Sequence, residues 1–275
     1  MSAIPVTQSH ADRYDNLVVP TWSAEVDNTL VHFLHDLPMG TTPTVLVPES
    51  RTGHLVLAAF PALPERTRFM VVDPSSEMLD ACRQRLKNAQ RSIFYSGQSI
   101  TKLSYAQGVF DAILAGYGFV TQGDIPLAGG ELLRVLRPNG IVAAAITLRH
   151  SIPTFTDMLR ESLLKLEMRD IESALDAFHQ ALIEPEDLAP AFAQLGLHLT
   201  QSTIREFTLH FPSVEDFLFS PFIESTFLPR WLAICTEPEQ RKPILTHVVR
   251  TLNTYFYGRT LPVPVRVACV LLQRQ

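Results

Sequence analysis

The chain lacks several features that would assign it to a class at once. It has no uninterrupted run of about 18 apolar residues, so the sequence predicts no transmembrane helix. Charged residues make up only 19% of the 275 residues, which argues against a disordered chain and against an extended charged helix. The net charge of −5 gives no electrostatic reason to expect nucleic acid or an anionic membrane as a partner.

Cysteine is scarce as well, with only Cys82, Cys235 and Cys269. Because they are odd in number and widely spaced, they indicate neither a disulfide framework nor a metal knuckle, and we expect buried thiols in a reducing compartment. His198, His210 and His247 lack metal-like spacing with a cysteine or with one another, so no metal site is predicted. Residues 1–12 lack the basic start and apolar block of a signal peptide, and a cytoplasmic location is expected.

The first half of the chain alternates short β-rich runs with helical stretches. The β-rich runs are residues 44–47, 69–72, 93–95, 109–114 and 141–146. Such alternation is typical of βαβ units with a parallel sheet. Because the runs are apolar throughout, the sequence predicts an α/β fold with helices on both faces of the sheet.

The pattern changes after about residue 150. Helical periodicity dominates, an aromatic segment occupies residues 211–227, and residues 263–272 have strong β character. We predict one domain over residues 1–275. It has a core at 14–150, a helical insertion or lid with one strand at 151–260, and a final antiparallel edge strand at 261–275.

Two residues mark a candidate ligand site at the carboxyl ends of the first two strands, where parallel sheets bind nucleotide-like ligands. Gly53 closes the first strand-to-helix turn, and Asp73 ends the second strand 20 positions later. A glycine lets a ligand approach the backbone, and the acid can hold both hydroxyls of a ribose. A turn glycine and a helix-capping aspartate explain the same two residues without any ligand.

The order of the segments resembles the class I S-adenosylmethionine-dependent methyltransferases of the small-molecule, type 11-like kind. Residues 45–55, 71–79, 110–114 and 132–140 are similar to successive motifs of that family, and Tyr14 with Asp15 resembles the pair on its N-terminal helix. The resemblance implies a Rossmann-like, seven-stranded sheet with helices on both faces and a helical insertion.

The resemblance also implies S-adenosylmethionine as cofactor. The positions that match its binding residues are Tyr14, Glu49, Gly53, Asp73, Pro74, Gln98 and Tyr117. Asp73 would take the ribose, and Gln98 would replace an acid that contacts the adenine amino group. Tyr117 or Phe119 would cover the adenine or the substrate mouth.

The first motif departs from the family pattern, which has an acid after the strand and three glycines in the turn. Here Val47 aligns with the acid, and Glu49 and Arg51 occupy two of the glycine positions. Arg51 would project a cation near the usual place of the sulfonium, although Glu49 can replace the missing carboxylate from a shifted position. Two functions remain open: methyl transfer from S-adenosylmethionine to a small-molecule acceptor, or a catalytically inactive pseudo-methyltransferase that acts as a binding or scaffold protein.

A catalytic base is not essential, because methyl transfer to a good nucleophile depends mainly on alignment. If a base is required, the candidates are His54, after the first turn, and His150, after the fifth strand. A solvated or capping imidazole is the preferred explanation of each of them. We expect a small-molecule substrate or a protein partner, and neither nucleic acid nor membrane; the acceptor, the pathway and the oligomeric state stay open.

Overall fold

The computed structural model describes residues 9–35 and 37–275, so most of the segment read for a signal peptide lies outside the described residues. The chain divides into two compact units. The first, called the sheet unit here, comprises residues up to Leu148 together with Ile183–Arg205 and Val267–Gln275. The second, called the helical unit, comprises Arg149–Leu182 and Glu206–Arg266. The insertion predicted at 151–260 therefore divides differently, because residues 183–205 pack with the sheet.

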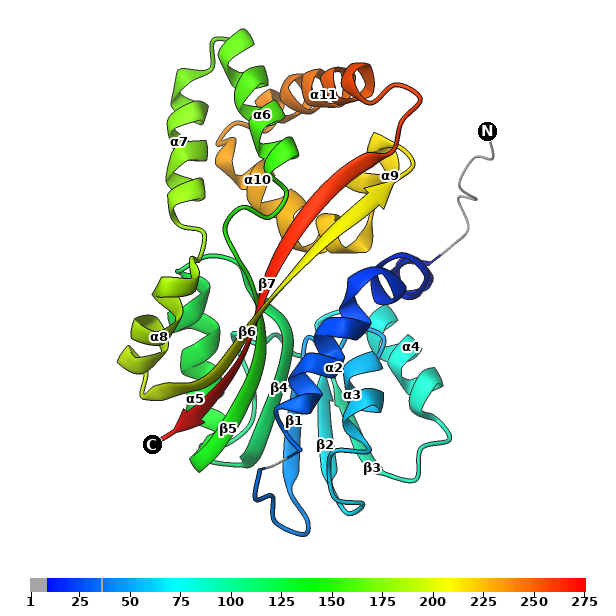
Figure 1. The fold of residues 1–275 in the computed structure, drawn as a ribbon, viewed down its shortest axis with the longest axis vertical. Coiled ribbons are helices and arrows are strands. Elements are labelled where there is room, and N and C mark those ends of the chain that lie inside the picture. Colours follow the sequence, from blue (N-terminus) through cyan, green and yellow to red (C-terminus); the bar gives the residue numbers. More distant parts are fainter. Residues whose placement is uncertain (1–8, 36) are drawn as a thin grey trace. The chain divides into compact units, whose positions relative to one another are not determined.

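Seven strands form one sheet, as predicted. In chain order they are β1 (Thr44–Pro48), β2 (Arg68–Val72), β3 (Ser92–Ser96), β4 (Phe110–Phe119), β5 (Leu136–Thr147), β6 (Leu197–Phe211) and β7 (Leu261–Arg274). The order across the sheet is β3-β2-β1-β4-β5-β7-β6, of which β1, β2, β4 and β5 can be followed side by side in Figure 1. β1 to β5 pair in parallel, and β7 runs antiparallel to β5.

The last strand is antiparallel as predicted, but it is not an edge strand. β7 lies between β5 and β6, and β6 forms the edge. The physical reason is visible in its burial: residues 267–272 are all buried, so both faces and both sides of this stretch are covered. A strand that is apolar at every position needs a neighbour on each side as well as a layer on each face.

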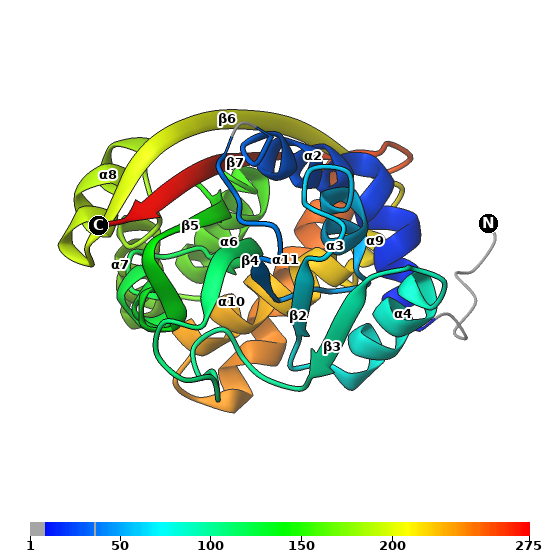
Figure 2. The same cartoon turned by 90° about the horizontal axis from the view of Figure 1, so that it is seen from below.

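Helices cover both faces of the sheet unit. One group is α1 (His10–Arg13), the π-helical segment η1 (Tyr14–Ser23), α2 (Ala24–His32), α3 (His54–Ala59) and α4 (Ser76–Leu86). The other group is η2 (Ile125–Gly129), α5 (Gly130–Val135) and α8 (Pro185–Gln194), which share a large apolar core with β4, β5 and β7. Figure 2 shows α2 beside α3, and α4 beside β3.

Helix α4 illustrates how the local sequence positions the site. Ser75 caps it, because its Oγ accepts a hydrogen bond from the backbone N–H of Met78 at 3.3 Å. Met78, Leu79 and Cys82 are buried on the face toward the sheet, as the periodicity predicts. The cap fixes where the helix begins, and so fixes Asp73 and Ser75 at the end of β2.

The helical unit contains α6 (Pro153–Lys165), α7 (Arg169–Gln180), α9 (Val214–Leu218), η3 (Ile223–Phe227), α10 (Leu228–Ile234) and α11 (Pro238–Tyr255). Its core is aromatic: Phe155 stacks on Trp231 at 3.9 Å between ring centroids, and Phe217 lies 5.7 Å from Phe155. The aromatic segment thus serves as core, although Phe219 is 56% exposed. In the described part of the chain, no helix combines the length and apolar character needed to cross a bilayer.

Candidate functional site at the carboxyl ends of the strands

The turn after β1 keeps the backbone of a glycine-rich turn with only one glycine in it. Glu49, Arg51 and Gly53 all have left-handed backbones, with φ of 50°, 51° and 86°. For a residue with a Cβ this conformation costs roughly 1–2 kcal/mol. Gly53 has a second constraint, because a Cβ there would lie 2.6 Å from Cys82 Sγ. The packing of α4 therefore requires glycine at position 53 whether or not a ligand binds.

The two residues that replace glycines hold each other. Arg51 Nη2 lies 3.7 Å from Glu49 Oε2, and the two side chains are 16% and 13% exposed. Each charge is mostly withdrawn from water, so each offsets part of the cost of burying the other. Glu49 thus faces a cation of its own chain.

Asp73 is fully buried at the end of β2. Its Oδ2 accepts a hydrogen bond from the backbone N–H of Arg51, and its Oδ1 accepts one from the backbone N–H of Ser75, both at 2.9 Å. Pro74, beside it, is exposed. The carboxylate that would hold a ribose therefore presents no accessible surface and binds the first turn to α4 instead.

The N-terminal segment is tied to the same turn. Thr52 Oγ1 donates a hydrogen bond to Asp15 at 2.5 Å, Arg85 pairs with Asp15, and Arg85 Nε donates to the carbonyl of Thr52 at 2.7 Å. His54 Nε2 lies 3.8 Å from Asp15. Burial, and then the charge of Arg85, lower the pKa of His54 below its usual value. The structure gives His54 a place in this polar network at the first turn.

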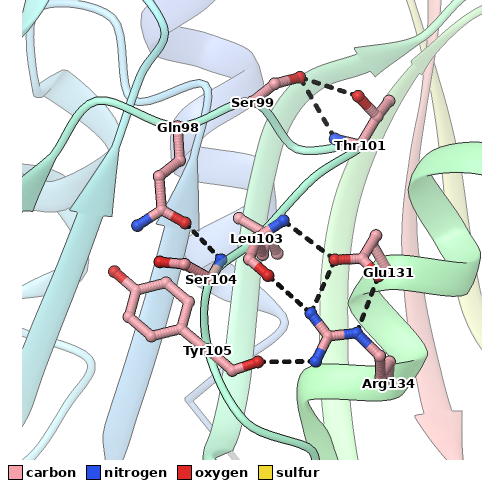
Figure 3. A network of polar contacts seen from close by, with 8 residues as sticks. All are labelled: Gln98, Ser99, Thr101, Leu103, Ser104, Tyr105, Glu131 and Arg134. Atoms are coloured by element: carbon pink, nitrogen blue, oxygen red, sulfur yellow. Dashed lines mark hydrogen bonds and ion pairs between the residues drawn. The ribbon is translucent and has the colours of Figure 1, made fainter.

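The side chain of Gln98 forms a hydrogen bond within its own loop (Figure 3). Its Oε1 accepts a hydrogen bond from the backbone N–H of Ser104 at 2.7 Å. Its Nε2 donates to Ser96 Oγ at 2.8 Å. Glu131 and Arg134 of α5 brace the same loop through Leu103 and Tyr105. The hydrogen bond from Arg134 lowers the pKa of Glu131. The amide predicted to meet adenine is thus part of an internal brace.

Three hydroxyl groups meet where η1 approaches β4. Tyr117 donates a hydrogen bond to Ser23 Oγ at 3.1 Å, and Tyr14 shares a hydrogen bond with the same Oγ at 3.3 Å. The rings of Trp22 and Tyr117 lie edge to face at 5.2 Å. Phe119 does not join this group, since it is buried in the core behind the sheet, so the prediction that it could cover a ligand is wrong.

Asp27 is a buried acid that sequence reasoning missed. It is 3% exposed, and among residues 9–35 and 37–275 it makes no hydrogen bond or ion pair. Burial raises its pKa to about 8. The signal was present, because position 27 shares a helical face with Leu30, Val31 and Leu34, where an apolar residue is expected.

The other histidine candidate belongs to the helical unit. His150 has a left-handed backbone, with φ of 68°, and its ring lies 6.2 Å from that of His179. Its role as a base stays a prediction. The described residues contain no group of three or more histidine, cysteine or acidic side chains placed to hold a metal ion.

Comparison with known proteins agrees with this fold. Residues 50–140 match a family model described as a methyltransferase domain. The chain is similar to a solved Bacillus halodurans structure described as a candidate methyltransferase, with 13% identity and a TM-score of 0.55 over 90% of this chain and 98% of that one. It is also similar to the YcgJ protein of Bacillus subtilis, with 13% identity and a TM-score of 0.51 over 91% of this chain and 98% of that one. A search of curated proteins found no match.

These findings define the fold of the chain. It has the fold of the solved class I methyltransferases, and residues 50–140 match the model of a methyltransferase domain. The predicted resemblance to the class I S-adenosylmethionine-dependent methyltransferases is therefore confirmed. At such low identity the solved structures show the fold alone, so the function depends on the site itself.

In the described conformation the site does not fit the cofactor. A ribose would need a carboxylate with accessible surface, and Asp73 has none. The turn would need to present bare backbone, and Glu49 and Arg51 place side chains there.

Proposed function

We propose that this protein uses the methyltransferase fold as a binding scaffold and is a pseudo-methyltransferase. The proposal depends on one observation, the buried Asp73 carboxylate with both oxygens occupied by backbone N–H groups of its own chain. A hydrogen bond to a charged group contributes roughly 1.5–3 kcal/mol, so cofactor binding would have to replace two such bonds before gaining anything.

Several contacts hold the turn at residues 49–53 in the conformation in which Asp73 is buried. Arg51 is held by Glu49, Thr52 is held by Asp15 and Arg85, and α4 packs its Cys82 against the turn. Opening the turn would disturb all of these contacts together. These contacts favour a structural role for the turn over a role in ligand binding.

Titration with S-adenosylmethionine and with its demethylated product tests the proposal. The expected result is neither saturable heat nor a change of melting temperature at millimolar ligand. A site filled at 100 times its Kd would stabilise the fold by roughly 2.7 kcal/mol, which a thermal melt detects easily. Saturable binding of either ligand to the native protein would overturn the proposal.

A second function, methyl transfer from S-adenosylmethionine to a small molecule, is favoured by the strained turn. Two non-glycine residues keep the left-handed conformation that a cofactor-binding turn requires. Strain of this kind is often stored at functional sites. In that case the free protein is closed, and binding has to open the turn.

The double variant Glu49→Gly with Arg51→Gly separates the two functions. For a scaffold, the variant gains no cofactor affinity, because Asp73 stays occupied by the backbone. For a gated enzyme, it binds the cofactor at least about tenfold more tightly, since each glycine removes both a side chain and a strained conformation. Glu167→Gly is the matched control, because Glu167 is also left-handed, with φ of 56°, but lies in the helical unit.

A further inference from the structure

A cavity in the helical unit is lined by residues outside all the methyltransferase motifs. It has a volume of about 540 Å³ and is formed by the start of α9, the C-terminal end of α11 and the loop that leads into β7 (Figure 1). Sites for small molecules normally have volumes of roughly 300–1,000 Å³. Every lining residue belongs to the helical unit, so this unit builds the cavity from its own elements.

The loop after α11 forms one wall of the cavity and has a fixed backbone. The N–H of Phe256 donates to the carbonyl of Leu252, and the N–H of Arg259 donates to the carbonyl of Phe256, both at 2.9 Å. Gly258 has a left-handed backbone, with φ of 66°, which glycine adopts without strain. These features hold Phe256, Tyr257 and Arg259 in place at the cavity.

The same wall carries aromatic rings that the helical unit leaves in contact with water. Tyr257 is 88% exposed, and Phe256 is half-buried. Aromatic rings stabilise a fold or a complex mainly through the large apolar surface that they remove from water. Val214 and Leu261 also line the cavity. The lining therefore offers apolar surface to a ligand that contains a ring.

Arg259 is the one charged residue among the described residues that line the cavity. Its side chain is exposed and makes neither a hydrogen bond nor an ion pair with another described residue. A guanidinium fits a carboxylate through two parallel hydrogen bonds. A single arginine therefore matches a ligand with one carboxylate.

We propose that this cavity binds a small aromatic carboxylate, with the ring against Phe256 and Tyr257 and the carboxylate on Arg259. The inference goes beyond the proposed function, since it involves neither Asp73 nor the turn after β1. It assigns to the helical unit a small-molecule site of its own.

Two acidic residues near the cavity already have partners. Glu215 Oε1 accepts a hydrogen bond from Asn253 Nδ2 at 3.5 Å, and Asp216 Oδ2 accepts one from Ser213 Oγ at 2.8 Å. Both donors belong to residues that line the cavity. Because the two carboxylates are engaged and Arg259 is not, the arrangement favours an anionic ligand over a cationic one.

The test uses 4-hydroxyphenylacetate as the probe, because it joins a ring to a carboxylate. 4-Hydroxyphenylacetamide keeps the ring without the charge, acetate keeps the carboxylate without the ring, and tyramine carries the opposite charge. Titration of the full chain, followed by two-dimensional NMR, should show saturable shifts of the Gly258 and Arg259 amide signals. The acid should bind at least about tenfold more tightly than each of the other three compounds.

Two exposed lining residues can be changed with little effect on the fold. Arg259→Gln should weaken binding of the acid at least about tenfold and leave binding of the amide unchanged. Tyr257→Ala should weaken binding of the acid and of the amide by the same factor, about three- to tenfold. Arg250→Gln, at an exposed position of α11, is the matched control and should change neither.

Four results would overturn the inference: no saturable shift with the acid up to about 20 mM, equal affinity for the acid and the amide, tighter binding of tyramine than of the acid, or binding that Arg259→Gln leaves intact. Titration with S-adenosylmethionine on the same samples tests the proposed function separately. Binding of the cofactor contradicts the scaffold proposal alone, and failure of the acid to bind contradicts the cavity proposal alone.

Discussion

Two aspartates of the sheet unit are almost equally buried but differ in the hydrogen bonds that they accept. Asp73 is fully buried and accepts two backbone hydrogen bonds, whereas Asp27 is 3% exposed and accepts none. The first holds the protein together at the corner between β1 and α4. The second lowers the stability of the fold, because its carboxyl group is buried without a hydrogen bond. The difference teaches that burial alone does not define the role of a carboxyl group, and that the hydrogen bonds it accepts must be considered as well.

The largest effect is expected from the pH profile of Asp27→Asn. The folded pKa of about 8 lies above the ordinary value of 3.8, so the contribution of Asp27 to stability is largest at low pH and is lost as pH rises from about 4 to 8. Asparagine does not titrate, so its profile lacks this loss. Between pH 5 and pH 9 urea unfolding should show the native protein losing on the order of 4 kcal/mol more than the variant. Parallel profiles would mean that Asp27 is not a buried, unpaired acid.

Asp73→Ala should show the opposite behaviour. It leaves the partly buried N–H groups of Arg51 and Ser75 without their acceptor, and each such loss costs roughly 1–3 kcal/mol. Urea unfolding at pH 7 should show a loss of about 3 kcal/mol. Asp80→Ala, at an exposed position, serves as the control and should change stability by less than about 0.5 kcal/mol. Equal effects of the two substitutions would erase the contrast between the aspartates.

Arg51→Gly sharpens the comparison at the turn itself. Glycine relieves the left-handed strain but increases the freedom of the unfolded chain, so a net gain of about 0.5 kcal/mol is expected in chemical denaturation. The backbone N–H that bonds Asp73 is retained. A loss of more than about 1 kcal/mol would show that the Glu49 pair outweighs the strain.

The smallest effect is expected from Gln98→Ala. Two hydrogen bonds of a partly exposed loop are lost, which should cost about 0.5–1 kcal/mol. Hydrogen exchange should accelerate at Ser104, whose N–H loses its acceptor. Unchanged exchange there would mean that Glu131 and Arg134 brace the loop without help.

The sequence predicted the sheet well because its strands are apolar runs bounded by turns. It placed β1, β2 and β3 within a residue or two. It misjudged β7 as an edge strand, since local β character says nothing about what lies on either side. Strand β4 also runs further than expected, to Phe119, through an irregular register after Ala115.

The candidate site was harder to predict than the sheet. The motif positions Tyr14, Glu49, Gly53, Asp73 and Tyr117 do gather near the carboxyl ends of the strands, as the order of the segments implied. Which of these groups can still bind a ligand depends on contacts between residues that are far apart in the sequence, and short motifs do not predict such contacts. The motifs did not indicate that the backbone N–H of Arg51 would donate a hydrogen bond to Asp73. They also did not indicate that the Asp27 carboxyl would accept no hydrogen bond.

The close approach of Cys82 to Gly53 has a consequence for the history of such chains. A lineage that abandons the cofactor is free to replace the glycines that served only the ligand, but it cannot replace one that a neighbouring sulfur atom also requires. A glycine at position 53 is therefore weak evidence for catalytic activity in any related chain that also keeps the cysteine at position 82.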